Sequence, residues 1–324
     1  MSPHGAVARV VRAAPAGEGE LLREVIDGLR ESRRRLDPKY FYDERGSKLF
    51  DRICRQPEYY LPRLETSILK ARLPAFARGF GYHARVIEPG SGSSAKTRIL
   101  LDALLAPATY VPVDISATHL DRAAQALRKR YPALQVLPVV ADFTQPFDLP
   151  AGDRPFDRTL VFFPGSTIGN LEPKDAVRLL AAMGRMAGRY GAVVVGADLK
   201  KDPRVLEKAY NDAAGLTAQF NLNILAHLNE RFAADFDLGS FSHFAFWNPR
   251  AGRIEMHLVS TREQTVSIGG TRIFINRDES IWTESCHKYE PAQFKTMARQ
   301  ASLKVDDVWT DPEKQFSVQI LSCA

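Results

Sequence analysis

The chain has 324 residues, of which 45% are apolar and 25% charged, and its formal net charge is +6. This length exceeds one ordinary domain, so two domains or one elaborated domain are expected. No stretch approaches the roughly 18 apolar residues that a membrane span needs, and the N-terminus lacks the apolar segment of a secretion signal. The three cysteines are far apart, without metal-ligand spacing, which favours reduced thiols, no metal site and a cytoplasmic protein.

The positive charge raises the question of nucleic-acid binding. The basic residues are spread widely, and only residues 30–35 and 128–130 form small clusters. Solvated helix faces produce such clusters more often than phosphate-binding surfaces do, and no RNA-binding signature is visible. We therefore expect a monomer that binds a small-molecule substrate, with neither nucleic acid nor a membrane as partner.

The N-terminal part predicts a helix followed by an aromatic segment. Residues 18–34 place their apolar side chains on one helical stripe. Residues 40–63 are rich in aromatic residues, glycine and proline. This segment is either a loop that packs its rings against the domain, or a lid that brings the hydroxyl groups of Tyr42 and Tyr59 over a ligand.

A helix over 65–78 leads to the most informative stretch of the chain. A strand beginning at Val86 is followed by a turn at Gly90 and Gly92 and by a helix over 97–105. Strand, glycine turn and helix are typical of nucleotide-type α/β domains. The turn nearly spells a phosphate-binding loop, with Ala95 in place of its second glycine before Lys96. The other interpretation is a dinucleotide or adenosine site, and the turn alone does not decide.

The next two strands favour an adenosine ligand. The apolar segment 110–113 ends on Asp114, at the distance where such folds place a ribose-binding carboxylate. An NTPase would use this residue on magnesium instead. The segment 136–140 is followed by Asp142 and Phe143, which can bind an adenine amine and pack on the base. These strand ends favour S-adenosylmethionine over a phosphate-binding loop or a nicotinamide.

The parallel pattern continues as far as residue 198. A helix is expected over 116–130, and a strand over 159–163 precedes a turn with two glycines that ends at Asn170. Asn170 is either a cap of the following helix or a ligand for a substrate amine or carboxylate. A helix over 172–187 and a strand over 192–198 complete this part.

The remaining chain has a different character. Helical periodicity runs through 203–232, and alternating segments joined by short turns follow, which predicts antiparallel strands. The expected strands are 241–247, 253–260, 263–268 and 271–275, and the chain ends with a helix over 291–301 and strands over 303–309 and 315–321. A parallel core that finishes in an antiparallel pair is typical of the class I methyltransferase sheet. The predicted fold is therefore an α/β, Rossmann-like sheet with an added α+β region.

Seven segments of the chain are specific enough to indicate a family. They are FYDERGSKLFDRICRQPEYYLPR, EPGSGSSAKTRILLDAL, FFPGSTIGNLEP, GADLKKD, AYNDAAGLTAQFNLNIL, RIEMHLVS and TESCHKY, in this order from about residue 38 to the C-terminus. Together they resemble the histidine Nα-methyltransferases of ergothioneine biosynthesis. The resemblance implies S-adenosylmethionine as methyl donor and three methylations of the histidine α-amine to give hercynine.

The resemblance also implies the domains and the site. It assigns 64–198 and 290–324 to the donor-binding domain, and 15–63 and 199–289 to the substrate domain. The implied donor site consists of Gly90, Lys96, Asp114, Asp142 and Phe143, with Lys96 on the methionyl carboxylate. The implied substrate site consists of Tyr42, Tyr59, Gly165, Asn170, Tyr210, Met256, Glu284 and Cys286. In this picture Tyr42 and Tyr210 hold the carboxylate, Asn170 orients the amine and Glu284 binds the imidazole, with Tyr42 and Asn170 as the catalytic residues.

One segment departs from the family pattern. The family continues its glutamate as E-S-S-Y-K-Y, whereas this chain has Cys286 and His287 in place of a serine and a tyrosine. The change is either neutral or alters the choice of amino acid, since a thiol is a poorer hydrogen-bond partner than a hydroxyl. The alternatives to a histidine methyltransferase are a methyltransferase for another amino acid or small amine, a non-catalytic donor-binding sensor, and a nucleotide-hydrolysing enzyme.

Overall fold

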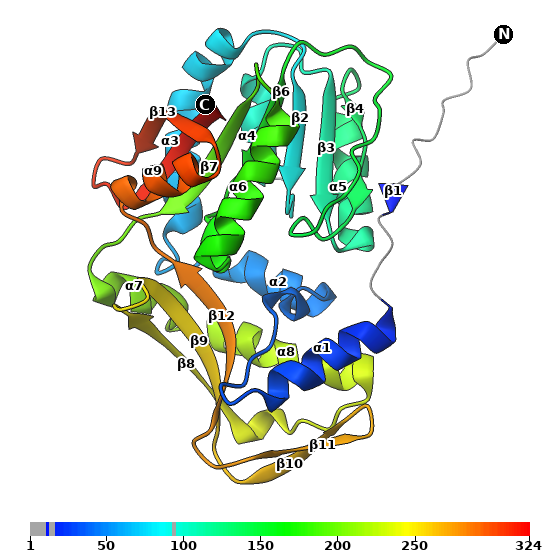
Figure 1. Ribbon diagram of the computed structural model, residues 1–324, viewed down its shortest axis with the longest axis vertical. Helices are drawn as coiled ribbons and strands as arrows, with labels where there is room; N and C mark the ends of the chain where they lie inside the picture. Colours follow the sequence, from blue (N-terminus) through cyan, green and yellow to red (C-terminus); the bar gives the residue numbers. More distant parts are fainter. Residues whose placement is uncertain (1–10, 13–16, 93–94) are drawn as a thin grey trace, which may run out of the picture.

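The large sheet of the protein has the predicted parallel core and terminal antiparallel pair. The computed structural model describes residues 11–12, 17–92 and 95–324. Within these residues nine strands form one sheet in the order β1-β5-β3-β2-β6-β7-β14-β13, with β4 paired to β3 (Figure 1). The strands are β1 (Val11–Arg12), β2 (Arg85–Pro89), β3 (Thr109–Asp114), β4 (Gln135–Val136), β5 (Val139–Val140), β6 (Thr159–Phe163), β7 (Ala192–Asp198), β13 (Leu303–Thr310) and β14 (Phe316–Cys323). β14 is antiparallel to β7 and to β13, which confirms the terminal antiparallel pair.

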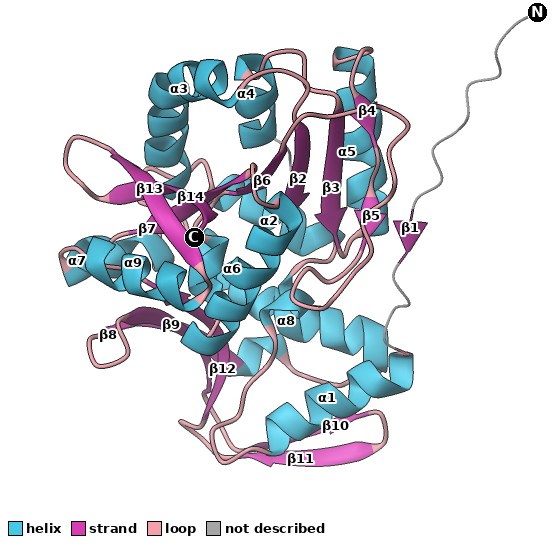
Figure 2. Ribbon diagram, turned by 45° about the horizontal axis from the view of Figure 1, so that its top comes forward, coloured by secondary structure: helices cyan, strands magenta, loops and turns pink. Residues whose placement is uncertain are grey.

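Helices cover both faces of the large sheet, as Figure 2 shows. They are α3 (Leu61–Phe80), α4 (Ala95–Ala103) and α5 (Ala117–Arg130) on one face, and α6 (Pro173–Ala187) and α9 (Pro291–Gln300) on the other. Successive strand residues therefore join different cores: Val86 packs with the first group of helices and Ile87 with the second. Burial on both faces explains why these strands are continuous apolar segments. No helix in the described part of the chain combines the length and apolar character that crossing a membrane requires.

The remaining helices and strands pack around a second, smaller sheet. This small sheet is antiparallel, in the order β12-β9-β8, and β10 and β11 form a separate two-stranded ribbon. The elements are α1 (Glu18–Arg30), α2 (Glu44–Ile53), α7 (Pro203–Tyr210), α8 (Leu216–Phe232), β8 (Phe241–Asn248), β9 (Arg253–Ser260), β10 (Gln264–Ile268), β11 (Thr271–Ile275) and β12 (Ser280–His287), with the short helices η1 (Pro38–Phe41), η2 (Thr167–Asn170) and η3 (Leu238–Ser240). The N-terminal helices pack against α8 and β11. The domain boundaries themselves stay a prediction, and residues 15–16 lie outside the described residues.

Three local predictions were incomplete. The aromatic segment is not irregular throughout, because Asp43 accepts a hydrogen bond from the Gly46 amide at 2.6 Å and starts α2. Residues 203–232 form two helices, since Asp212 accepts from two amide groups and starts α8 anew. Strand β12 was not expected. Its sequence is polar, and a register shift between Trp282 and Glu284 interrupts the alternation of its side chains.

The small sheet is joined to α8 by one buried amide, that of Asn221. Its Nδ2 lies 3.0 Å from the His257 carbonyl oxygen and 2.9 Å from Nδ1 of His243, and its Oδ1 accepts from the Thr283 hydroxyl at 2.6 Å. These partners lie on all three strands. The side chain therefore ties the helix to the whole sheet.

We expect Asn221→Leu to lower the free energy of unfolding by about 2–4 kcal/mol, because buried polar partners would lose their hydrogen bonds. Urea unfolding followed by circular dichroism measures this difference. The matched control is Gln219→Leu, an exposed position on the same helix, for which we expect a change within about 0.5 kcal/mol. Equal stability of the two variants would contradict the role assigned to Asn221.

Candidate functional site

The predicted donor residues gather at the carboxyl edge of the large sheet. Gly90 follows β2, Asp114 ends β3 and Asp142 follows β5, and these strands are parallel neighbours. The carboxylate of Asp114 accepts hydrogen bonds from the Gly92 amide at 3.3 Å and the Ser116 amide at 3.0 Å. The glycine turn and the carboxylate are thus held together at one end of the sheet.

The turn has the shape of a ligand cradle. Gly90 has a φ of +67° and Gly165, in the turn after β6, has a φ of +88°, a conformation that favours glycine. A Cβ atom on Gly90 would lie 3.2 Å from the Phe143 ring, so this ring stands directly beside the turn. The buried Oγ of Ser91 has no hydrogen-bond partner among the described residues. An unpaired hydroxyl, a carboxylate and a ring face suit the polar and aromatic groups of an adenosine-type ligand.

Glu65 is a residue of this site that the sequence analysis missed. Its buried carboxylate accepts from the Gly165 amide, with both oxygens at 2.9 Å, and pairs with the ammonium of Lys96. Glu65 therefore connects α3 to the turn after β6 and to α4. No signal marked it, because it lies within an ordinary helical stretch of the sequence.

Glu88 was also missed, although it opens the quoted EPGSG segment. Its carboxylate accepts from the Thr97 hydroxyl at 2.7 Å and from the Tyr110 hydroxyl at 2.6 Å. Burial raises the pKa of Glu88 to about 7, while the two hydrogen bonds act in the opposite direction. These contacts tie β2 to α4 and β3, so they hold the ends of the glycine turn in place.

The predicted substrate residues face this edge from the small sheet. Nδ2 of Asn170, at the end of η2, donates to Oε1 of Glu284 at 3.0 Å. Glu284 pairs with Met256 across β12 and β9. Burial raises the pKa of Glu284 to about 7, and the positive charge of Lys288 acts in the opposite direction. A hydrogen bond thus crosses from the large-sheet edge to the small sheet.

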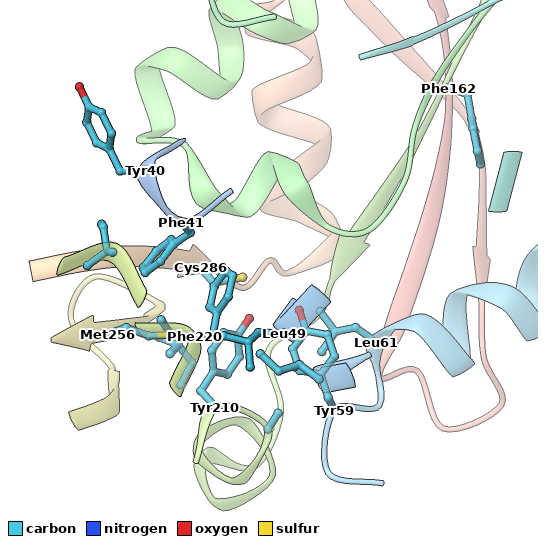
Figure 3. Packing of buried hydrophobic residues seen from close by; sticks show 14 of the residues in the cluster. Tyr40, Phe41, Leu49, Tyr59, Leu61, Phe162, Tyr210, Phe220, Met256 and Cys286 are labelled. Atoms are coloured by element: carbon cyan, nitrogen blue, oxygen red, sulfur yellow. The ribbon is translucent and has the colours of Figure 1, made fainter. Parts of the chain in front are cut away.

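Aromatic rings from the N-terminal segment line the same region. The Tyr59 and Tyr210 ring centroids are 5.9 Å apart in an edge arrangement, and the Tyr42 ring lies 5.8 Å from that of Phe220. Figure 3 shows Tyr59, Tyr210 and Cys286 close together. Burial, and then the nearby charge of Glu284, raises the pKa of Tyr42 well above its ordinary value, so this residue stays protonated. The charge of Asp114 acts on the pKa of Tyr42 in the same direction.

The predicted residues are therefore brought together, each from its expected part of the chain. The arrangement is a polar strand-end cradle next to a cluster of tyrosines and the partly buried carboxylate of Glu284. In the described part of the chain no group of three or more His, Cys, Asp or Glu side chains is placed to hold a metal ion. All three cysteines lie in this part and are free thiols.

Comparisons with known proteins show which proteins this chain is similar to. A family model described as "Histidine-specific methyltransferase, SAM-dependent" matches residues 21–323. The histidine N-alpha-methyltransferase of Mycobacterium tuberculosis is 38% identical over 311 residues, which cover 94% of this chain and 95% of the relative. Ergothioneine biosynthesis protein 1 of Neurospora crassa is 28% identical over 86% of this chain and 32% of its own length. The 4-dimethylallyltryptophan N-methyltransferase of Aspergillus fumigatus is 27% identical over 91% of both chains.

We expect Gly196→Ala to weaken the binding of S-adenosylhomocysteine roughly tenfold or more. A Cβ atom at this position on β7 would lie 2.0 Å from Oε1 of Glu65, so the carboxylate would be displaced from Gly165 and Lys96. Isothermal titration calorimetry measures the dissociation constant. The control is Gly79→Ala on α3, where an added Cβ meets nothing within 4 Å and binding should equal that of the wild type. Wild-type affinity in Gly196→Ala would refute the role of Glu65 at this edge.

Proposed function

Because the chain belongs to the family of histidine-specific, S-adenosylmethionine-dependent methyltransferases, we propose that it methylates the α-amine of L-histidine three times to give hercynine. The observation that carries this proposal is the partly buried carboxylate of Glu284, which is hydrogen-bonded to Asn170 close to the buried rings of Tyr59 and Tyr210. Such a carboxylate accepts the N–H of a neutral imidazole. It is poorly suited to a purely apolar side chain, which would leave it unpaired.

The donor is assigned to the cradle at the large-sheet edge, held by Gly90, Lys96, Asp114, Asp142 and Phe143. The carboxylate of Asp114 retains lone pairs for ribose hydroxyls beyond the two amide groups that it already binds. The ammonium of Lys96 is paired with Glu65 and has further N–H donors for the methionyl carboxylate. When bound, the donor supplies an electrophilic methyl group on its sulfonium.

The substrate is assigned to the pocket between Asn170 and the tyrosines. Since Nδ2 of Asn170 donates to Glu284, its carbonyl oxygen is left to accept from the substrate amine. Tyr42 and Tyr210 are assigned to the carboxylate, and Tyr59, Gly165, Met256 and Cys286 shape the walls. Methyl transfer needs the neutral amine in line with the methyl group, so orientation by these residues supplies most of the catalysis. The amine proton leaves to water, either directly or by relay through a hydroxyl such as that of Tyr42, which passes its own proton on to water as it accepts the one from the amine.

The alternatives receive less support. A relative named for a tryptophan derivative matches this protein over 91% of both chains, and Cys286 stands where the family pattern has serine. However, Glu284 and Asn170 are both present and in contact, which favours histidine over another amino acid. The presence of Tyr42, Tyr59 and Tyr210 close to Glu284 disfavours a non-catalytic sensor. The two-domain division, the monomeric state and the cytoplasmic location stay predictions.

With S-adenosylmethionine and each protein amino acid in turn, we expect methylation of histidine alone, with a product that carries three added methyl groups. Mass spectrometry of the reaction identifies the product. Asn170→Ala serves as the control, because it should lose turnover while still binding S-adenosylhomocysteine. Methylation of another amino acid with none of histidine would overturn the proposed substrate, and donor binding without any turnover would favour a sensor.

The KM for histidine should rise several-fold as the pH falls from about 8 to about 6. The pKa of Glu284 is near 7, so the carboxylate that accepts the imidazole N–H is lost by protonation below this value. Glu284→Gln cannot ionise and should show a higher KM, by roughly tenfold, since a charged hydrogen bond is lost. Its KM should also respond less to pH than that of the wild type, because only the titration of the substrate itself remains. Initial rates at saturating donor give both profiles, and identical profiles would exclude Glu284 as the titrating group.

A further inference from the structure

The ammonium group of Lys288 is fully buried beside the proposed substrate pocket. Its Nζ lies 2.9 Å from Oδ2 of Asp198, 3.0 Å from the Tyr210 hydroxyl oxygen and 3.1 Å from Sγ of Cys286. An ammonium has three N–H donors and no acceptor. Lys288 therefore donates in all three contacts, and each partner accepts.

The direction of these hydrogen bonds determines how Tyr210 and Cys286 can bind a ligand. The Tyr210 oxygen accepts from Lys288, so the hydroxyl hydrogen must point elsewhere. Burial raises the pKa of Tyr210 well above its ordinary value, so that hydrogen is retained. The sulfur of Cys286 is a nearby acceptor for it, but a weak one. A substrate carboxylate is a much stronger acceptor and would take this hydrogen bond.

Asp198 holds Lys288 in position. Besides Lys288, its carboxylate accepts from the Tyr60 hydroxyl at 2.7 Å and from the ammonium of Lys201 at 2.6 Å. Burial alone would raise the pKa of Asp198, but the two ammonium groups outweigh it and the pKa is lowered. One carboxylate and two ammonium groups leave a net positive charge beneath the pocket. The carboxylate of Asp198 therefore holds the Lys288 ammonium at its place beneath Tyr210 and Cys286.

We propose that Lys288 is a positioning residue that makes Tyr210 a hydrogen-bond donor, so that the pocket selects amino acids over amines without a carboxylate. The inference rests on the proposed function, because Tyr210 is assigned to the substrate carboxylate there. It also gives a role to the GADLKKD and TESCHKY segments, which contain Asp198, Lys201 and Lys288 and whose lysines had no assigned role.

The test compares histidine with histamine, which keeps the amine and the imidazole but lacks the carboxylate. In the wild type, histidine should bind the complex with S-adenosylhomocysteine much more tightly than histamine. Lys288→Met should weaken histidine binding roughly tenfold to a hundredfold and leave histamine binding within about threefold. The preference for histidine should therefore collapse. Isothermal titration calorimetry gives all of these dissociation constants, and S-adenosylhomocysteine binding reports that the variant is folded.

Two further variants separate positioning from structural support. Lys201→Met removes the other ammonium of Asp198 but contacts neither Tyr210 nor Cys286 in the described hydrogen bonds, so it should keep the preference for histidine. Tyr210→Phe should lose this preference, and adding Lys288→Met to it should have little further effect. The proposal is overturned if Lys288→Met weakens the binding of histidine and of histamine equally. It is also overturned if the double variant weakens histidine binding by the product of the two separate factors.

The result also distinguishes this inference from the proposed function. If the wild type methylates histidine and Lys288→Met keeps its preference, only the role of Lys288 fails. If the wild type acts on a different amino acid, the proposed substrate fails, and the comparison is made between that amino acid and its decarboxylated amine. A wild type that binds no amino acid overturns both.

Discussion

The buried ion pair between Asp198 and Lys288 joins the two parts of the molecule. Asp198 ends β7 in the large sheet and Lys288 follows β12 in the small sheet, with 2.9 Å between their charged atoms. The Tyr289 amide donates to the Asp198 carbonyl oxygen at 2.9 Å. Two buried charges are stable only where each keeps its partner, so the pair favours this one arrangement of the two sheets. The pair therefore fixes how the end of β12, with Glu284 and Cys286, faces the large-sheet edge.

The rest of the site follows from the geometry of parallel strands. Each parallel strand delivers its following turn to the same edge, where the glycine turn and the strand-end carboxylates meet. The small sheet closes this edge from the other side, and the Asn170–Glu284 hydrogen bond spans the junction. A donor and an acceptor can thus be held in adjacent compartments. Methyl transfer requires little more of a protein than such alignment, together with a neutral amine.

Selectivity can rest on few side chains in this architecture. Relatives named for different amines share most of the length of this chain. Next to aromatic rings, a carboxylate that is partly removed from water, such as that of Glu284, disfavours any ligand that leaves it without a hydrogen-bond donor. The thiol of Cys286 accepts a hydrogen bond from Lys288. Because a thiol is a weak hydrogen-bonding group, it affects the choice of substrate much less than the carboxylate of Glu284 does.

The sequence by itself determined the parallel core, its terminal antiparallel pair and the glycine turn and carboxylates at the strand ends, because these depend on local apolar periodicity and on the residues that follow each strand. It did not reveal β12, whose polar and bulged sequence is stabilised by pairing with β9. Nor did it reveal Glu65 or the partners of Lys288. Those side chains acquire their roles through contacts with residues about a hundred positions away or with other strands, and only the tertiary structure decides which buried charges meet.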